Sequence, residues 1–306
     1  MRGGDGMNAV LAELGRRYVE RWVALLVLPG LLYVAGAAVA YRLGHTHWAD
    51  LGRLTGLLEP GGPLDGRRPS SVWVFVIAVL PVLSAAAGLA ARGAAAALGR
   101  LWFEPWPYGL RRLARRRTAV RAERWEAADR AYRAELAGAG ARPSAATGAR
   151  IDLLAARRNA VALGPPAHPT WTGDRLDAVH ARVWGWYRLD VVFSWPRLWL
   201  ILNEAEQNAL RVARAELDAA VTLAGWGVLT VLPALWWWPS LLLAAGVFAL
   251  GLRRTRGAVD TLAHLTEAAF DLRAAALARE LGFEVPEGRL SPETGAQVTA
   301  HLRKHV

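Results

Sequence analysis

Four stretches of this chain of 306 residues contain no charged residue and approach the length needed to cross a lipid bilayer: residues 22–41, 71–91, 219–235 and 239–252. A helix needs about 20 apolar residues to span ~30 Å of hydrocarbon, and it bonds every backbone polar group internally. The fourth stretch is short, so we expect it to tilt or to be extended by its neighbours. The pattern predicts an all-α integral membrane protein with four transmembrane helices. Three spans with a re-entrant segment is the alternative.

An aromatic segment joins the third and fourth stretches. Residues 236–240 read Trp-Trp-Trp-Pro-Ser, which is typical of a turn at the membrane interface, where tryptophan is enriched. The first stretch carries small residues at 38–40 that resemble a signal-peptide cleavage site. It is longer than the apolar part of a signal peptide, so we expect a retained transmembrane helix.

Arginine placement predicts the orientation, because loops that stay in the cytoplasm are rich in arginine. Residues 42–70 have four arginines against three acids, whereas residues 92–216 have 21 arginines against 12 acids. Arginines also precede the first stretch and follow the second and fourth: Arg16, Arg17, Arg21, Arg92, Arg100, Arg253, Arg254 and Arg256. We therefore expect a multi-pass protein of the bacterial cytoplasmic (inner) membrane, with its amino and carboxyl termini and its middle segment in the cytoplasm.

These observations divide the chain into five parts. An amphipathic cytoplasmic helix is expected in residues 1–21, two transmembrane helices with an outer loop at 42–70 in residues 22–99, a cytoplasmic helical segment in residues 100–216, a transmembrane hairpin in residues 217–252 and cytoplasmic helices in residues 253–306. The cytoplasmic helical module thus lies between the second and third spans. The helical carboxyl-terminal part follows the fourth.

Helix signals within the polar segments can be placed more closely. We expect a charged helix at 110–136, a Gly/Ala/Pro-rich linker at 138–148, helices at 151–163 and 174–187, and a helix from Asn203 or Glu204 that continues into the third span. Residues 190–202 are apolar but too short to span, so they should form a buried or monolayer-inserted segment. Ser291 followed by Pro292 predicts the start of a further helix.

The overall charge narrows the choice of partner. The formal net charge is +11 and almost all of it is arginine, which suits either nucleic acid or anionic lipid. Because the arginines flank apolar stretches, we expect lipids of the anionic inner leaflet and no nucleic acid. The chain has no cysteine, which excludes disulfides, thiolate catalysis and cysteine-ligated metal.

One arginine stands within an apolar segment. Arg197 lies between Trp195 and Trp199, so its guanidinium must either pair with a carboxylate, with Asp190 as the nearby candidate, or reach a lipid phosphate or another ligand. The favoured interpretation is a structural salt bridge that fixes the cytoplasmic module, with the two tryptophans as anchors. These four residues are the candidate structural, lipid or ligand contacts.

The remaining polar candidates are weaker. Asp218, at the cytoplasmic end of the third span, could line a pore mouth, although a solvated helix-end acid is the commoner case. Asp177 and His180 lie three residues apart and could act as acid and base, yet an exposed helix face is more common. The histidine pairs His45/His47 and His301/His305 lack a third ligand nearby. We therefore expect no catalytic residue, no cofactor and no metal.

A segment of about thirty residues resembles a family of uncharacterised actinobacterial multi-pass membrane proteins. The family signature is P-T-x-x-G, then Y-x-x-D, then W-P-R-L, found here as Pro169, Thr170, Gly173, Tyr187, Asp190, Trp195, Pro196, Arg197 and Leu198. The family commonly reads P-T-R-L-G-N, from which Trp171, Thr172 and Asp174 depart. The resemblance implies the membrane location and carries no known activity.

Two functions of different classes fit this sequence. The first is a non-enzymatic, oligomeric inner-membrane protein that presents its cytoplasmic helical module to a partner or to itself. The second is a homo-oligomeric ion channel or pore-forming effector gated by its cytoplasmic helices, since bestrophin-type anion channels share this order of spans and polar segments. That analogy is one of layout alone. An enzyme acting on lipid ranks third.

Overall fold

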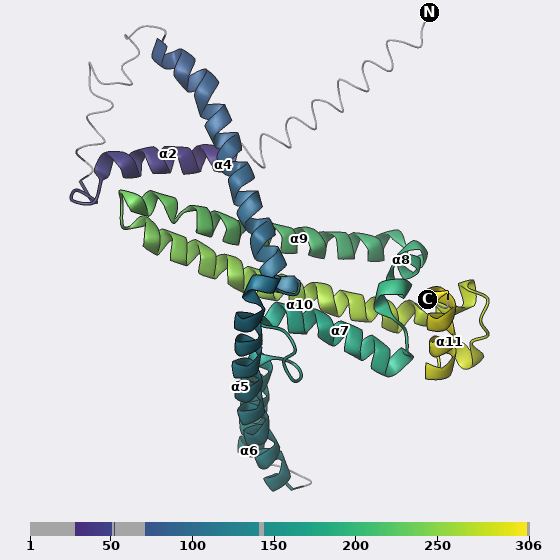
Figure 1. Cartoon of the computed structure of the whole chain (residues 1–306). Helices are drawn as coiled ribbons and strands as arrows, with labels where there is room; N and C mark the ends of the chain where they lie inside the picture. The colour runs from purple at the N-terminus through teal and green to yellow at the C-terminus, as the bar shows by residue number, and fades with distance from the viewer. Residues whose placement is uncertain (1–27, 51, 53–70, 141–143, 305–306) are drawn as a thin grey trace, which may run out of the picture. The chain divides into compact units, whose positions relative to one another are not determined.

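The computed structural model describes residues 28–50, 52, 71–140 and 144–304, and within them the chain forms nine α-helices and no strand (Figure 1). Contacts divide the chain into two compact units, each of which is described by itself. Unit 1 holds the described residues up to Leu98 together with Val221–Leu252, and unit 2 holds Gly99–Ala220 and the described residues of Arg253–Val306. The predicted helix in residues 1–21, the start of the first stretch and most of the outer loop lie outside the described residues.

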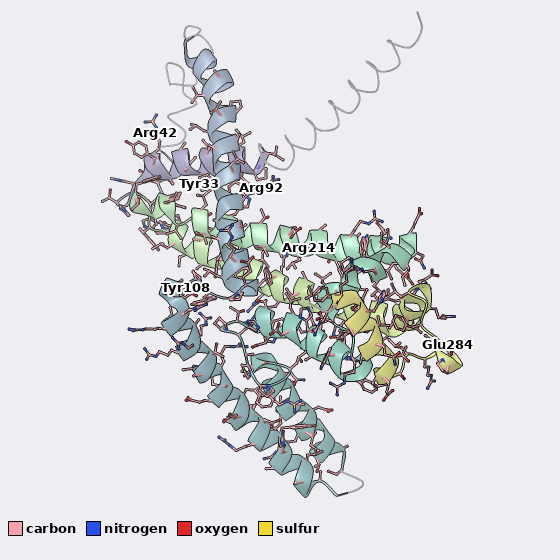
Figure 2. All side chains as sticks on the ribbon, turned by 45° about the vertical axis from the view of Figure 1, so that its right-hand side comes forward. Tyr33, Arg42, Arg92, Tyr108, Arg214 and Glu284 are labelled. Atoms are coloured by element: carbon pink, nitrogen blue, oxygen red, sulfur yellow. The ribbon has the colours of Figure 1, made fainter. Side chains whose placement is uncertain are left out.

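Unit 1 consists of apolar helices. Its elements are α2 (Leu28–Leu43), the part of α4 (Ser71–Phe103) before residue 99, the end of α9 (Glu204–Leu229), the 3-10 turn η3 (Leu232–Leu235) and the start of α10 (Ser240–Glu280). Among its described residues, the acidic and basic side chains at neutral pH are those of Arg42, Asp50 and Arg92 alone, and Figure 2 labels both arginines. Unit 1 therefore has almost no charge to expose.

Glycines let α9 and α10 approach backbone to backbone within unit 1. A Cβ atom placed on Gly227 would lie 2.7 Å from the amide nitrogen of Phe248, and one on Gly251 would lie 2.6 Å from that of Ala224. No side chain fits at these distances. Close contact through small residues is the usual basis of helix association in lipid, where water does not drive helices together.

Helix α4 contacts α2 and α9 in the same way. Gly30 of α2 packs directly on the backbone carbonyl of Ser84, and a Cβ atom on Gly225 of α9 would lie 2.9 Å from the amide nitrogen of Ala95. The four helical segments of unit 1 thus meet at glycines, which fixes their spacing by shape.

Aromatic rings gather where α2 ends and where α9 turns into α10. The rings of Tyr41 and Trp236 meet edge to face with centroids 6.2 Å apart, and those of Trp48 and Trp238 do so at 5.5 Å. The indole nitrogen of Trp237 donates to the backbone carbonyl of Trp48 at 3.0 Å. The aromatic turn expected at residues 236–240 therefore packs against the end of α2.

Unit 2 begins with an antiparallel helical hairpin formed by α5 (Arg111–Gly138) and α6 (Ala145–Val161). The indole nitrogen of Trp125, buried on α5, donates to the carbonyl of Ala162 at 2.9 Å. Asp129, which is also buried, receives Arg158 of α6 at 3.2 Å and Arg133 at 2.6 Å. An aromatic anchor and a shared carboxylate hold the two helices together.

The core of unit 2 is formed by α7 (Trp171–Tyr187), α8 (Val191–Ile201), the start of α9, the end of α10 and α11 (Pro292–Arg303). Phe270 of α10 is fully buried at its centre, with Leu198 of α8, Val183 of α7 and Val298 of α11 around it. Hydrophobic burial of this kind supplies most of the stability of such a unit. Helices α7 and α8, which follow one another in the sequence, and α11 therefore close around α10.

Side-chain caps set where these helices begin. The hydroxyl of Thr170 accepts the amide of Gly173 at the start of α7, the carboxylate of Asp190 accepts that of Val192 at the start of α8, and Ser291 caps α11. Each cap satisfies an amide that the helix leaves unbonded. The predicted start at Ser291 is confirmed. Of the two alternatives for residues 190–202, a buried or a monolayer-inserted segment, α8 packs one face on the core and leaves the other exposed.

Other expectations need correction. Helix α6 begins at Ala145, not at residue 151, because Ser144 caps it by accepting the amide of Thr147. The residues after 252 do not start a separate helix, because α10 runs unbroken from Ser240 to Glu280. By length and composition, two helical stretches could cross a membrane, Ala78–Phe103 and Glu204–Leu235; α2 and α8 are shorter apolar helices.

Candidate functional site

The most deeply buried charged group in the described chain is the guanidinium of Arg175 on α7. Its Nε donates to Oδ1 of Asp260 at 2.6 Å, and its Nη1 donates to Oε1 of Glu267 at 2.9 Å, both carboxylates lying on α10. The side chains of Arg175 and Glu267 are 1% and 8% exposed. Two carboxylates on one arginine compensate the cost of removing its charge from water.

Two further side chains complete this group, which we call the Arg175 network. Arg182, two turns along α7, reaches the second oxygen of Glu267 at 3.3 Å. His264 of α10 lies 3.6 Å from Asp260 and 3.7 Å from Glu267, with most of its ring exposed. The two arginines balance the two carboxylates, so the network ties α7 to α10 and leaves neither carboxylate free for chemistry.

A second arginine organises the loop before α7. The guanidinium of Arg121 donates to the carbonyl oxygens of Val161 at 2.6 Å, His168 at 2.6 Å and Thr170 at 3.0 Å, and it pairs with the carboxylate of Asp174. Its fixed fork of donors thus bonds three backbone carbonyls and one carboxylate at once. Arg121 therefore has a structural role.

The start of α7 holds the Pro-Thr-x-x-Gly pattern of residues 169–173. The hydroxyls of Thr170 and Thr172 both donate to the carbonyl of Trp102, at 2.6 and 3.0 Å. A Cβ atom on Gly173 would lie 2.9 Å from that of His168, so only glycine fits under the loop. The Pro-Thr-x-x-Gly pattern thus caps a helix and lets a loop pack on it.

The Tyr-x-x-Asp pattern of residues 187–190 connects the junction of α7 and α8 to α10 and α11. The hydroxyl of Tyr187 donates to Asp271 at 2.7 Å, and burial together with this hydrogen bond and the nearby carboxylate charge raises the pKa of Tyr187 to about 12. The carboxylate of Asp190 pairs with Arg303 of α11 at 2.5 Å. Burial opposes ionisation of this carboxyl, but hydrogen bonds from Arg303 and the amide of Val192 outweigh it and lower the pKa of Asp190.

The expected salt bridge between Arg197 and Asp190 is wrong, because Asp190 is taken by Arg303. The guanidinium of Arg197 donates instead to the carbonyl of Phe193, one turn back on its own helix, at 2.8 Å. Within the described chain Arg197 forms no ion pair. Trp195 and Trp199 pack on the core, with the ring of Trp195 6.1 Å from those of Trp199 and Phe270. The structure therefore groups the two tryptophans with the core and separates Arg197 from Asp190.

The other predicted polar residues lie on exposed faces of unit 2. Asp218 of α9 pairs with Arg214 at 3.3 Å, and both side chains are about two-thirds exposed. Asp177 does not pair with His180, as the spacing suggested; its carboxylate lies 2.5 Å from Nε2 of His168 instead. The two threonine hydroxyls that follow His168 are bonded to Trp102, as described above, so this acid–histidine pair has no free hydroxyl beside it. We find no cluster of three metal-ligating side chains within the described residues.

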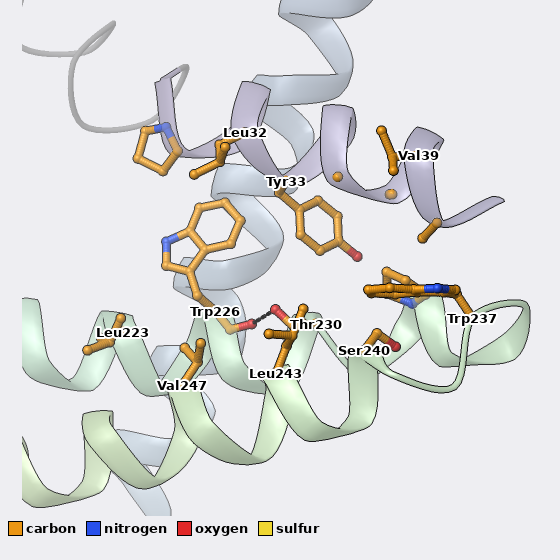
Figure 3. A pocket seen from close by; sticks show the side chains of 15 residues that line it. Leu32, Tyr33, Val39, Leu223, Trp226, Thr230, Trp237, Ser240, Leu243 and Val247 are labelled. Carbon is orange, nitrogen blue, oxygen red and sulfur yellow. Dashed lines mark hydrogen bonds between the residues drawn. The ribbon is translucent and has the colours of Figure 1, made fainter. Parts of the chain in front are cut away.

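Unit 1 contains an apolar cavity of about 510 Å³ that the sequence did not reveal (Figure 3). Its walls come from α2 on one side and from α9, η3 and the start of α10 on the other. Three aromatic rings, those of Tyr33, Trp226 and Trp237, line it together with aliphatic side chains. Figure 3 shows the rings of Tyr33 and Trp226 side by side in its wall, in a tilted contact with centroids 5.8 Å apart.

The polar groups that line the cavity differ in their bonding. The hydroxyl of Tyr33 donates to the carbonyl of Leu229 at 3.1 Å, and that of Thr230 donates to the carbonyl of Trp226 at 2.8 Å. The hydroxyl of Ser240 is buried, with 2% of the residue exposed, and no described residue provides it with a hydrogen-bond partner. Ser240 is the one lining hydroxyl left to meet another molecule.

The Arg175 network was not predicted, although the positions of its charged residues in the sequence indicate it. Arg175 stands in the apolar stripe of its helix, four and eight residues before Val179 and Val183, which are both buried. Glu267 likewise lies between Ala263 and Phe270 on the buried face of α10. Opposite charges placed in register with core positions of two helices indicate a buried ion pair.

No protein-family model matches this chain, and no curated protein or solved structure was found to be similar to it. The function must therefore be argued from the arrangement of its own residues.

Proposed function

We propose that the chain is a multi-pass protein of the bacterial inner membrane, non-enzymatic and homo-oligomeric, which presents unit 2 in the cytoplasm for association. One observation carries this proposal. Three helices contribute to both units, and in α9 and α10 the boundary between the units lies within three residues of the end of an uncharged run, whereas in α4 the run ends at Arg92, six residues before the boundary. A partition based on contacts thus agrees with one based on charge, as expected when lipid surrounds one unit and water the other.

The three helices follow the same rule. In α4, charged residues begin at Arg92, six residues before the boundary at Leu98. In α9 the last charged residue is Asp218, and unit 1 begins at Val221. In α10 the first is Arg253, which is also the first residue assigned to unit 2. Arginines follow the uncharged runs of α4 and α10, which favours the cytoplasm for that side, whereas the charged part of α9 is mixed, with two arginines and four acids.

On this proposal four segments cross the membrane. Two of them, within Ala78–Phe103 and Glu204–Leu235, are long enough by themselves. The other two are the apolar stretch that contains α2 and the first half of α10. The aromatic contacts among Tyr41, Trp48 and residues 236–238 then lie at the outer interface, where such rings are enriched. The resemblance to actinobacterial membrane proteins points to the same location.

Anionic lipid is the partner that suits the start of α5. Five exposed arginines follow Tyr108, whose ring is covered by the guanidinium of Arg111 at 3.7 Å: Arg111, Arg112, Arg115, Arg116 and Arg117. Within the described residues none of them has a carboxylate partner. Exposed arginines beside a span attract the negative headgroups of the inner leaflet. Unit 2 is thereby held at the membrane surface.

Self-association is supported by the outer face of α8. While Leu198 faces the core, Val192 and Leu200 are 66% and 79% exposed and Pro196 between them is exposed too. The polar groups of unit 2, by contrast, bond to one another in the Arg175 network and in the capped helices. A face of this kind favours binding of a protein surface over catalysis.

Reporter fusions test the membrane arrangement. Green fluorescent protein inserted between α5 and α6, or fused to the carboxyl terminus, should fluoresce, and alkaline phosphatase inserted near residue 60 should be active. An active phosphatase between α5 and α6, or a chain that stays in solution without detergent, would overturn the proposal.

The mass of the detergent-purified protein tests association. We expect a multiple of the 33.2 kDa chain, reduced towards one chain by Leu200→Glu and unaffected by Leu153→Glu, an equally apolar exposed position on α6. A wild-type protein that is monomeric in detergent and in vesicles would contradict self-association. The channel alternative is tested on the same preparation, because anion flux in liposomes that Asp218→Arg alters would favour it.

A further inference from the structure

The cavity in unit 1 has walls that suit a hydrocarbon chain. All of its lining residues are uncharged, and aliphatic side chains such as Leu32, Leu243 and Val247 alternate with aromatic rings. A volume of about 510 Å³ is within the range of sites that hold small molecules. The site therefore selects for an apolar molecule of moderate size.

The position of Ser240 adds one polar requirement. Its buried hydroxyl has no partner among the described residues, whereas Tyr33 and Thr230 are bonded within the protein. Buried hydroxyls nearly always have a hydrogen-bond partner, since leaving one unbonded is costly. A bound molecule with an acceptor oxygen at the end of its apolar chain would supply that partner.

Small residues on α2 create the space. Gly36, Ala37 and Ala40 line the cavity, and a Cβ atom on Gly36 would meet no atom within 4 Å. Gly30 packs on the backbone of Ser84 in α4, and Tyr33 contacts Trp226 of α9, so α2 is held at these points while its small residues leave the gap. The cavity is thus a consequence of how α2 is anchored.

We propose that this cavity binds one acyl chain of an outer-leaflet phospholipid, whose ester carbonyl accepts a hydrogen bond from Ser240. The inference rests on the proposed membrane arrangement, in which Ser240 and Trp237 lie near the outer interface and Pro29 lies deeper. An acyl chain entering beside the tryptophans would then run along α2 with its ester at the level of Ser240.

Photo-crosslinking tests this proposal with a matched pair of glycine variants. The protein is reconstituted in phosphatidylethanolamine and phosphatidylglycerol vesicles that contain a phosphatidylglycerol with a diazirine in its acyl chain. Gly36→Leu places a side chain in the cavity and should reduce adducts on the peptides around Leu32 and Val247 about tenfold. Gly246→Leu, a position with equally open space that does not line the cavity, should leave them unchanged.

A pair of serine variants tests the hydrogen bond. Ser240→Ala should reduce the same adducts about fivefold, the loss expected for one hydrogen bond. Ser84→Ala removes another buried, unpartnered hydroxyl of unit 1 that does not line the cavity; it keeps the backbone atoms that contact Gly30, and should have no effect. This pair also decides the matter if Gly36→Leu lowers the melting temperature.

The outcomes separate the two proposals. Equal labelling of the cavity peptides in wild type, Gly36→Leu and Ser240→Ala, with lipid adducts elsewhere on unit 1, would overturn the acyl-chain site and leave the membrane arrangement intact. A protein that gives no lipid adduct at all and fails to enter vesicles would overturn the membrane arrangement itself.

Discussion

Arg175 and Glu267 form an ion pair of 2.9 Å in which both side chains are buried, although 92 residues separate them in the sequence. Buried pairs of this kind contribute little net stability when intact, because both charges lose their hydration. Breaking one is costly, since the remaining charge is left without compensation. The pair therefore specifies which face of α7 meets α10.

Replacing Arg175 with leucine should destabilise unit 2 by about 3–5 kcal/mol, because Glu267 and Asp260 lose their buried partner. Thermal melting of the purified protein in detergent measures the effect. Arg214→Leu, which breaks an exposed pair with Asp218, should change stability by about 0.5 kcal/mol or less. The double variant Arg175→Leu/Glu267→Leu should recover part of the lost stability. Equal losses in Arg175→Leu and Arg214→Leu would contradict a buried network.

The contact between α11 and α7 should not tolerate a methyl group at Gly295. A Cβ atom there would collide with the carbonyl oxygen of Tyr187, so Gly295→Ala should cost about 2 kcal/mol or more. Gly148 lies within α6 in open space, and alanine there should stabilise the protein by about 0.5–1 kcal/mol. Melting temperatures that move in the same direction for both variants would disprove this packing.

Arg188 ends α7 in the left-handed conformation, with φ of 52°. Glycine adopts this conformation without strain, so Arg188→Gly should stabilise the protein by about 1 kcal/mol. Arg188→Ala removes the same guanidinium but keeps the strain, and it should give no gain. Chemical denaturation of wild type and the two variants compares their free energies of unfolding. If the stacking of Arg188 on Trp184 were the dominant effect, both variants would be less stable than wild type.

Acid should weaken the contact between Asp190 and Arg303. Because the pKa of Asp190 is lowered in the folded protein, its stabilising effect is present above the pKa of about 3.9 that an unfolded chain has and is lost as the pH falls further. Melting curves between pH 3 and 7 should show this loss in wild type and much less of it in Arg303→Gln. A wild-type curve parallel to that of the variant would refute the assignment.

Alkali should act on Tyr187 in the opposite sense. The folded protein holds the phenol proton more tightly, with a pKa of about 12, so its stabilising effect is present below pH 10 and is lost as the pH rises from 10 to 12. Tyr187→Phe should be less stable than wild type at neutral pH and should lose less on going to pH 11. Melting temperatures at pH 8 and 11 provide the comparison.

The sequence predicted those features whose causes are local. Helix starts such as Ser291 follow from a residue and its next few neighbours, and the segment that forms α8 was recognised as too short to span because of its length and its arginine. Helix α6 was placed too late since Gly148 suggested a linker, although a capping serine and two alanines outweigh one glycine.

The partners of charged residues could not be predicted, because they depend on tertiary contacts. Asp190 was assigned to Arg197, seven residues away, but two helical turns separate them by about 10 Å along the axis, and α11 brings Arg303 from 113 residues away. The cavity was equally hidden. It depends on the contact of Gly30 with Ser84, which nothing in the spacing of either residue reveals.

The glycines at 227 and 251 give the α9–α10 hairpin a property of its own. Two helices whose backbones touch at two levels recognise each other by shape, without needing water to push them together. Such a hairpin can close as soon as both halves are in lipid, before α2 or α4 joins it. We expect it to be the first part of unit 1 to assemble and the last to separate in harsh detergent.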